Sequence, residues 1–243
     1  MDLYEDVFLY DLVHGSFADP QTFDFYRKQT EISGSPILEL ACGSGHVLIP
    51  LAKSGLEISG LDISAEMLGE CESKAAGQNI RVQVQHGDMR KFELGMKFKL
   101  IFIAGNSLQH LNTIEEISDC FTCVKRHLEP KGRFVVELFN PFIPLLVREQ
   151  GKRYMIGEFG DYVLSEDVYY DAATQVSHIN WHFWNRPSNN EKVLSFTMRQ
   201  FFPQEIDAFF NCNGFVIENK FGDFDEIQFN SNSPKQIIVA SME

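Results

Sequence analysis

Apolar residues between positions 36 and 139 occur in short runs that alternate with amphipathic stretches. Compact apolar runs are typical of buried strands, whereas apolar positions three or four residues apart predict helices. This alternation predicts a mostly parallel sheet with helices on both faces. The predicted strands are ILEL (37–40), EISGLDI (57–63), RVQVQHGD (81–88), FKLIFIAG (98–105) and RFVVELF (133–139).

The segment 114–128 carries the clearest helix signal in the chain. Thr113 and Glu116 have the spacing of a capping box, in which each side chain bonds the backbone of the other residue. Apolar side chains then recur at helical spacing, at Ile117, Phe121, Val124 and Leu128.

The pattern changes after Asn140, where strand-like runs follow one another without helices between them. These runs lie at 161–170, 175–184 and 192–202, and their order predicts an antiparallel insertion.

The last forty residues return to the first pattern. Residues 203–214 have Pro203 at the start and Gly214 past the end of a predicted helix. Two further strands follow, at 215–221 and 236–242. The predicted organisation is one domain built from 1–141 and 203–243, with the antiparallel β insertion at 142–202 covering an acceptor site.

Composition narrows the partners and the compartment. The formal charge is −13, and no large Lys/Arg cluster offers the basic footprint that nucleic acid or an anionic membrane requires. No apolar stretch approaches the roughly 20 residues of a membrane span. Five cysteines without an export signal predict reduced thiols and a cytoplasmic protein.

A glycine turn in ILELACGSGHVLIP (37–50) marks the first candidate site. Gly43 and Gly45 begin a dinucleotide fingerprint, but Leu48 stands where its third glycine belongs. No Lys or Arg occurs between Lys28 and Lys53, and the carboxylate of Glu39 would repel a pyrophosphate and attract a cation. The turn therefore favours a ligand with little negative charge.

Two further acids end the second and third predicted strands. Asp62 can accept both hydroxyls of a ribose, and Asp88 can accept from an amine-bearing ring. With Glu39 they match a ligand that carries adenine, ribose and positive charge, as S-adenosylmethionine (SAM) does. Asp62 could instead cap the helix that starts near Ala65, and Asp88 could be a plain turn residue.

The order of E-x-A-C-G-S-G, G-L-D-I-S-x-x-M-L and H-G-D-M-R resembles the class I SAM-dependent methyltransferases. The segments FNP and GNSLQHL are similar to a small-molecule branch akin to glycine and amino-sugar N-methyltransferases. The resemblance implies a Rossmann-like, doubly wound α/β fold with a seven-stranded, mostly parallel sheet whose last strand is antiparallel.

The resemblance also assigns roles to single positions. It puts the methionine part of SAM against the first turn, the ribose on Asp62, and a cap on the methionyl end from Tyr26. The turn residues are Glu39, Ala41, Gly43, Ser44 and Gly45; the adenosine contacts are Ile63, Met67, Asp88 and Met89; the closing loop is Ala104, Gly105 and Asn106.

Catalytic candidates follow the fourth strand, where open α/β sheets bind ligands. His110 lies one helical turn from Asn106, so both could face a substrate, or His110 could be a surface or cap residue. Cys120 and Cys123 form C-x-x-C on a predicted helix, which favours a core position, and no metal site is expected.

The acceptor side is less defined by the sequence. In 175–184, the face with His178, Asn180 and His182 is either solvated or the wall of an acceptor pocket. The favoured function is methyl transfer from SAM to a nitrogen or oxygen of a small molecule. The alternatives are a non-catalytic SAM-binding module and a nucleotide-dependent oxidoreductase.

Overall fold

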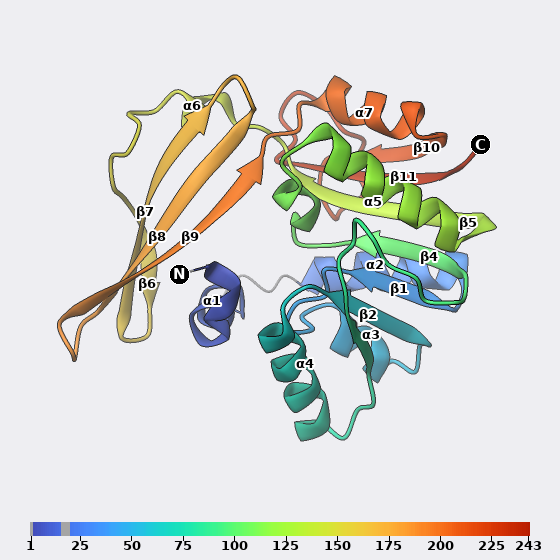
Figure 1. The fold of residues 1–243 in the computed structure, drawn as a ribbon, viewed down its shortest axis with the longest axis horizontal. Coiled ribbons are helices and arrows are strands. Elements are labelled where there is room, and N and C mark those ends of the chain that lie inside the picture. Colours follow the sequence, from blue (N-terminus) through green and yellow to red (C-terminus); the bar gives the residue numbers. More distant parts are fainter. Residues whose placement is uncertain (1, 16–19) are drawn as a thin grey trace.

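The computed structural model describes residues 2–15 and 20–243. It contains a seven-stranded sheet in the order β10-β11-β5-β4-β1-β2-β3 and a four-stranded sheet in the order β6-β7-β8-β9 (Figure 1). The first sheet consists of β1 (Ile37–Leu40), β2 (Ile58–Asp62), β3 (Gln83–His86), β4 (Phe98–Ile103), β5 (Leu128–Phe139), β10 (Phe215–Phe221) and β11 (Lys235–Met242). The second consists of β6 (Tyr154–Phe159), β7 (Tyr162–Asp171), β8 (Val176–Asn185) and β9 (Asn190–Arg199).

The seven-stranded sheet confirms the predicted doubly wound architecture. Strands β1 to β5 pair in parallel, and β11 runs antiparallel to both β5 and β10. Leu38 of β1 lies opposite Ser59 on one side and Ile101 on the other. Because parallel strands end at the same edge, the loops after β1, β2, β3 and β4 meet there.

Helices cover both faces of this sheet. One layer holds α2 (Pro20–Ser33), α3 (Leu48–Lys53) and α4 (Ala65–Gly77), and the other holds α5 (Ile114–His127) and α7 (Pro203–Cys212). Neighbouring side chains of β4 alternate between them: Ile101 and Ile103 pack with α5 and α7, while Leu100 and Phe102 pack with α2 and α3.

Helix α5 confirms its predicted signals. Thr113 and Glu116 form the capping box, with both reciprocal hydrogen bonds present. Cys120 and Cys123 are buried, and Cys120 has no exposed surface. The pair therefore serves the core, as expected from its position on the apolar side of the helix.

The insertion contains one strand more than the sequence pattern predicts. Strand β6 was missed because its burial does not alternate: neighbouring Met155 and Ile156 are both exposed, and the register shifts before Gly157. As an edge strand, β6 has one unpaired side, and of its residues only Phe159 is buried against the N-terminal elements, so the strand carries no apolar period. A short helix, α6 (Ile143–Leu146), precedes it.

The N-terminal elements lie between the two sheets (Figure 1). The 3-10 helix η1 (Leu3–Glu5) and helix α1 (Val7–His14) bury apolar side chains against the four-stranded sheet. Leu3, Leu9 and Val13 pack with Leu164 and Phe183 in one cluster. Packing on the four-stranded sheet thus places the N-terminal segment next to the carboxyl edge of the larger sheet.

A second link joins the sheets through the loop after β4, which contains the 3-10 helix η3 (Ser107–His110). Gln109 is fully buried; its amide donates to the Arg199 carbonyl at 2.8 Å and accepts from the Phe139 N–H at 3.0 Å. Arg199 in turn donates to the Asn112 carbonyl at 2.8 Å. These bonds hold β9 against the loop that follows β4.

Candidate active site

The loop after β1 holds three residues in the left-handed backbone region. Their φ angles are 56° at Ala41, 53° at Gly43 and 87° at Gly45. At Gly45 an added Cβ would lie 2.6 Å from Sγ of Cys71 and 2.8 Å from Ile49. A residue with a Cβ, such as Ala41, adopts this conformation at a cost of about 1–2 kcal/mol. Such conformations cluster at ligand sites, where the surrounding structure enforces them.

Asp62, the last residue of β2, joins the ends of two strands. Its Oδ2 accepts from the Gly43 N–H at 2.7 Å and its Oδ1 from the Ser64 N–H at 2.8 Å. Ser64 is the N-cap of α4, since its side chain accepts from the Met67 N–H, so Asp62 is not the cap. Burial raises the pKa of Asp62 against the opposing effect of these backbone donors. Each carboxylate oxygen keeps a lone pair for one further donor.

Glu39 places a second carboxyl group beneath the turn. It is 3% exposed, and its Oε2 has no hydrogen-bond partner among the described residues. Burial, with a contribution from Asp62, raises the pKa of Glu39 well above its usual range. A nearby cation would favour the charged form of such a group. The local field therefore suits a positively charged ligand better than a phosphate.

The loop after β4 faces the same edge. Gly105 and Asn106 both have left-handed backbones, with φ angles of 61° and 64°, and Ala104 before them is buried. The side-chain Oδ1 of Asn106 is buried without a partner among the described residues. An unpaired buried acceptor is costly, so this oxygen is available to a ligand donor.

Glu137 of β5 anchors that loop from behind. Its Oε2 accepts from the Gly105 N–H at 2.9 Å and from the Tyr26 hydroxyl at 3.4 Å, and its Oε1 accepts from Lys235 at 2.6 Å. Tyr26 is completely buried and stacks near Phe102, with centroids 4.6 Å apart. The structure therefore connects Tyr26 to the loop through Glu137. The sequence reasoning missed Glu137, because a single acid inside an apolar strand has no local signature.

The predicted adenosine contacts have mixed surroundings. Ile63 is 61% exposed, whereas Met67 is 1% exposed and Met89 is half-buried. Asp88 is bound by Arg90, whose Nη2 lies 2.7 Å from its Oδ2, and this bond holds the pKa of Asp88 below its usual range. Ile63 thus has apolar surface free for a ring, while the acceptor capacity of Asp88 is shared with Arg90.

Helix α1 is fastened over the glycine turn by one carboxylate. Asp11 Oδ1 accepts from the Ser44 hydroxyl at 2.6 Å and lies 3.0 Å from His46 Nε2, and Oδ2 accepts from Lys74 at 2.5 Å. Burial tends to raise the pKa of Asp11, but these three bonds outweigh it and leave the pKa well below its usual range. Ser44, predicted to contact the ligand, therefore bonds α1 in this structure.

His110 is held in one orientation by bonds to both ring nitrogens. Nδ1 lies 2.8 Å from the Thr197 carbonyl, which can only accept, so Nδ1 carries a proton. Burial lowers the pKa of His110 below the ordinary value, which favours the neutral ring. Nε2 is then the acceptor for the Tyr4 hydroxyl 2.5 Å away. The sequence placed His110 at the site but missed Tyr4, 106 residues away in the chain.

The two faces of β8 have different surroundings. Trp181 and Phe183 pack into the cluster that contains α1. His182 points to the other face, where Nε2 lies 2.5 Å from Asp167 Oδ2 and Nδ1 lies 3.4 Å from Glu191 Oε2. The face toward the site is therefore the aromatic one, and the imidazole of His182 contacts two carboxylates on the opposite face.

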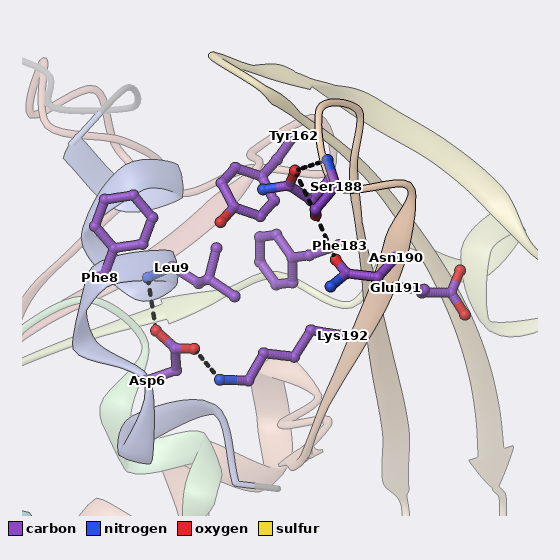
Figure 2. A pocket seen from close by; sticks show the side chains of 10 residues that line it. Asp6, Phe8, Leu9, Tyr162, Phe183, Ser188, Asn190, Glu191 and Lys192 are labelled. Carbon is purple, nitrogen blue, oxygen red and sulfur yellow. Dashed lines mark hydrogen bonds and ion pairs between the residues drawn. The ribbon is translucent and has the colours of Figure 1, made fainter.

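A hollow of about 460 Å³ opens between the start of α1 and the hairpin end of β8 and β9 (Figure 2). Leu9 lines this hollow. Because each residue of a helix turns by about 100°, Leu9 and Asp11 lie about 200° apart and project from opposite sides of α1. Along β9, Lys192 in its wall is five residues from Thr197, or about 17 Å. This hollow is thus remote from Asp62 and His110. Its other lining residues include Phe8, Tyr162, Phe183 and Asn190.

The described residues contain neither a cluster of metal-binding side chains nor a membrane-spanning helix. Within residues 2–15 and 20–243, His, Cys, Asp and Glu form no group of three or more that could hold a metal ion. No helix in the same ranges is long and apolar enough to cross a bilayer.

The site has the groups that SAM requires. Asp62 offers acceptor capacity for ribose hydroxyls, and the unpaired oxygens of Glu39 and Asn106 can accept from an ammonium group. The open backbone around Gly43 permits close approach. These are three acceptor groups at one edge of the sheet, and they complement a cationic, hydroxyl-bearing molecule.

Comparison with known proteins agrees with this chemistry. Residues 37–132 match a family model described as a methyltransferase domain. A putative methyltransferase, YqeM, of Bacillus subtilis (strain 168) is 25% identical over 94% of both chains. The structure is similar to that of the CcbJ methyltransferase from Streptomyces caelestis, with 26% identity, a TM-score of 0.82, and coverage of 92% of this chain and 90% of that one.

A shorter match concerns an N-methylating enzyme. The dTDP-3-amino-3,6-dideoxy-alpha-D-glucopyranose N,N-dimethyltransferase of Streptomyces fradiae is 33% identical over 53% of this chain, and the match spans 51% of the length of that relative. Together these findings show that residues 37–132 match a methyltransferase domain and that the whole chain is similar to methyltransferases. Its fold is one that SAM-dependent methyltransferases share.

Proposed function

We propose that this protein is a SAM-dependent methyltransferase that methylates a nitrogen or oxygen of a small molecule. The observation that carries the proposal is the junction of η1, η3 and β9, where a neutral His110 accepts from Tyr4. The loop that bears Asn106 leads directly into this pair. The junction therefore offers a proton acceptor beside the edge where the methyl donor binds.

The donor site is proposed on the residues described above. The methionyl end of SAM would lie along the turn at 41–45 and the loop at 104–106, with the ribose on Asp62. The adenine would lie near Ile63, Asp88 and Met89. Bound SAM supplies a methyl group on a sulfonium, and alignment of a nucleophile at near-attack distance can contribute about 7–11 kcal/mol.

Proton removal is assigned to Tyr4 and His110. Burial raises the pKa of Tyr4, so its hydroxyl stays protonated at neutral pH. A proton lost by the acceptor would pass to Oη of Tyr4 as the phenolic proton moves to Nε2 of His110. General bases of this kind contribute typically about 10²–10⁴-fold. Asn106 would orient the donor or the acceptor through its unpaired Oδ1.

The small size of the acceptor and the absence of nucleic acid among the partners remain proposals. They rest on the net charge of −13 and on the half-length amino-sugar N,N-dimethyltransferase relative, whose own name describes a small acceptor. A cytoplasmic location is proposed on the five cysteines, which are all free thiols.

The test is turnover of SAM with a panel of small amines and alcohols, followed as S-adenosylhomocysteine (SAH). We expect product with members of the panel, and a loss of about 10²-fold or more in kcat/KM for Tyr4→Phe. Tyr162→Phe is the matched control, because its hydroxyl lines the remote hollow. Binding of SAH without turnover of any small acceptor, or equal losses in both variants, would refute the proposal.

A further inference from the structure

The loop after β3 carries a carboxylate that is held by a nearby arginine. Asp88 Oδ1 accepts from the backbone N–H of Arg90 at 2.9 Å, and Oδ2 accepts from Nη2 of the same residue at 2.7 Å. Nε of Arg90 lies 3.0 Å from both oxygens. The planar guanidinium therefore meets the carboxylate with two nitrogens, which is the geometry in which Arg orients a carboxylate most firmly.

The same loop is fastened to the end of β2. The Gly87 N–H donates to the Asp62 carbonyl at 2.8 Å, and Nε2 of His86 lies 2.9 Å from the carbonyl oxygen of Ile63. Asp88 therefore follows directly on backbone that is tied to Asp62, the proposed ribose acceptor. The Asp88 side chain is 12% exposed, so its carboxylate is largely shielded from solvent but still open to a ligand.

The number of acceptor sites limits what this carboxylate can still bind. An ionised carboxylate has about four lone-pair sites. Three N–H groups of Arg90, on the backbone nitrogen, Nε and Nη2, occupy three of them. One site stays open among the described residues, and it takes one donor. Because the bonds from Arg90 lower the pKa of Asp88, the carboxylate is ionised at neutral pH and cannot donate a hydrogen bond itself.

The turn formed by Asp88 explains only part of this arrangement. The Asp88 carbonyl accepts from the Lys91 N–H at 2.9 Å, and the carboxylate accepts from the backbone N–H two residues on, as turn aspartates do. Both bonds involve backbone donors, so they do not require an arginine side chain at position 90. The guanidinium bonds are additional, and their effect is to fix the carboxylate.

Arg90 is itself anchored on helix α5. Its Nη1 donates to Oε1 of Glu116, and Sγ of Cys123 donates to its carbonyl oxygen at 3.2 Å. Glu116 is fixed in turn, because its Oε2 accepts from the Asn112 N–H at 2.8 Å. The guanidinium is thus held between two carboxylates, and α5 sets its orientation toward Asp88.

We propose that Arg90 is a positioning residue that makes the donor site select the amine of adenine and reject a ring carbonyl in its place. The proposal rests on the proposed SAM-dependent function and assigns a source to the base specificity of that site. An exocyclic amine donates into the one open site of Asp88, whereas the carbonyl of hypoxanthine sets a lone pair against it. A site that leaves its own polar groups unpaired rejects the wrong ligand strongly.

Orientation decides this selection because hypoxanthine also carries a donor, the N–H of the ring nitrogen next to its carbonyl. A carboxylate that is free to rotate can accept from that N–H and so tolerate the carbonyl beside it. Arg90 removes this freedom, since three N–H groups fix the plane of the Asp88 carboxylate. Without the guanidinium, we expect the carboxylate to accommodate both bases.

The test compares SAH with S-inosylhomocysteine, which carries hypoxanthine in place of adenine. Isothermal titration at neutral pH would give Kd for both ligands with wild type and with Arg90→Met, which keeps an apolar side chain without the guanidinium. We expect wild type to bind SAH at least about 30-fold more tightly than S-inosylhomocysteine. In Arg90→Met this ratio should fall to about threefold or less.

Arg90→Lys separates orientation from charge. Lysine keeps the positive charge beside Asp88, but its ammonium is a point charge that cannot fix the plane of a carboxylate. The ratio of the two Kd values should therefore fall at least about fivefold in this variant as well. A ratio that stays at the wild-type value in Arg90→Lys would overturn the proposal, even if Arg90→Met does not fold.

Glu116→Gln is the matched control for a purely structural role. It removes the charge of the second carboxylate that contacts Arg90 but keeps an oxygen for the Asn112 N–H. Urea unfolding should show a loss of stability in this variant, while the ratio stays within about twofold of wild type. An equal fall of the ratio in Glu116→Gln and Arg90→Met would show that fastening the loop to α5 is the whole effect, and would refute the assignment.

Failure of this proposal is distinguishable from failure of the proposed function. If wild type binds SAH and S-inosylhomocysteine equally, or if the ratio survives in Arg90→Met, Arg90 does not set the base specificity while the wider function stands. If wild type binds neither SAH nor SAM, the wider function fails.

Discussion

The two sheets contribute to the site in different ways. The carboxyl edge of the seven-stranded sheet presents strained backbone and carboxylates, namely Ala41, Gly43, Glu39 and Asp62. The four-stranded sheet presents a face of aromatic side chains, including Trp181, to the N-terminal helices. The first region offers binding groups that lie close together in sequence motifs, whereas the second brings together side chains from distant segments.

Under the proposed function, this difference would allow donor and acceptor recognition to vary separately. A donor common to many enzymes requires a constant backbone geometry, which a few neighbouring residues can specify. An acceptor that differs between enzymes is recognised by faces whose residues can change without altering the backbone. Substitutions in the two regions should therefore have separable effects on donor affinity, acceptor kinetics and stability.

The largest effect is expected from Asp62→Ala. The change removes a carboxylate that accepts two backbone donors and is proposed to accept the ribose hydroxyls. Charge-assisted hydrogen bonds are worth about 1.5–3 kcal/mol each, so SAH affinity should fall by about 2–4 kcal/mol, or roughly 30- to 1,000-fold. Isothermal titration would measure it. Unchanged affinity in a folded variant would remove Asp62 from the donor site.

Gly45→Ala should destabilise the fold by about 1–3 kcal/mol, because the new Cβ would overlap Cys71 and Ile49. Gly55→Ala is the matched control: its φ of 86° is nearly the same as the 87° of Gly45, but nothing lies within 4 Å of the added Cβ. Urea unfolding of both variants separates overlap from backbone strain. Equal losses would show that strain alone explains the glycine.

His182→Gln should cost stability but not function. The change disrupts contacts to Asp167 and Glu191 on the face of β8 that points away from α1, at a cost of about 1–2 kcal/mol. SAH affinity and acceptor KM should stay within about twofold. A severalfold rise in acceptor KM with unchanged unfolding would move the acceptor site to this face.

The smallest effect, and a pH-dependent one, is expected from Asp11→Asn. The folded-state pKa of Asp11 is lowered by its bonds to His46, Lys74 and Ser44, which outweigh the effect of burial. Its contribution is therefore fully present above the unfolded pKa of about 3.9 and is lost as the pH falls through the folded value. We expect a deficit of about 1 kcal/mol or less near neutral pH.

Urea unfolding of wild type and Asp11→Asn at several pH values checks this prediction. The deficit should stay constant between about pH 6 and 8 and shrink as the pH falls below about 4. A deficit that grows in acid would show that another group dominates the attachment of α1.

The sequence by itself determined the features that arise within a few residues. The capping box of Thr113 and Glu116 was predictable because both partners lie in one helical turn. The alternation of strands and helices was predictable because each element repeats its own apolar period. That the glycine turn and Asp62 meet at one edge was predictable because parallel strands end at the same edge, which follows from topology alone. Their role in binding the methyl donor stays a prediction.

Sequence patterns could not decide between two nearby residues that were equally suited to the same hydrogen bond. Asp62 and Ser64 were both possible caps of α4, and only the three-dimensional structure assigns the cap to Ser64 and the strand-joining bonds to Asp62. Likewise, the edge strand β6 buries only Phe159, so its sequence has no apolar period that would predict a strand.

The tertiary structure alone decided which distant groups meet. Tyr4 bonds His110 across 106 positions, and Gly105 N–H bonds Glu137 across 32. Which face of β8 meets α1 was equally undetermined, since alternation defines two faces but not their neighbours. Such contacts depend on how Leu3, Leu9 and Val13 pack on the second sheet, and close packing between remote segments leaves no periodic trace in either one.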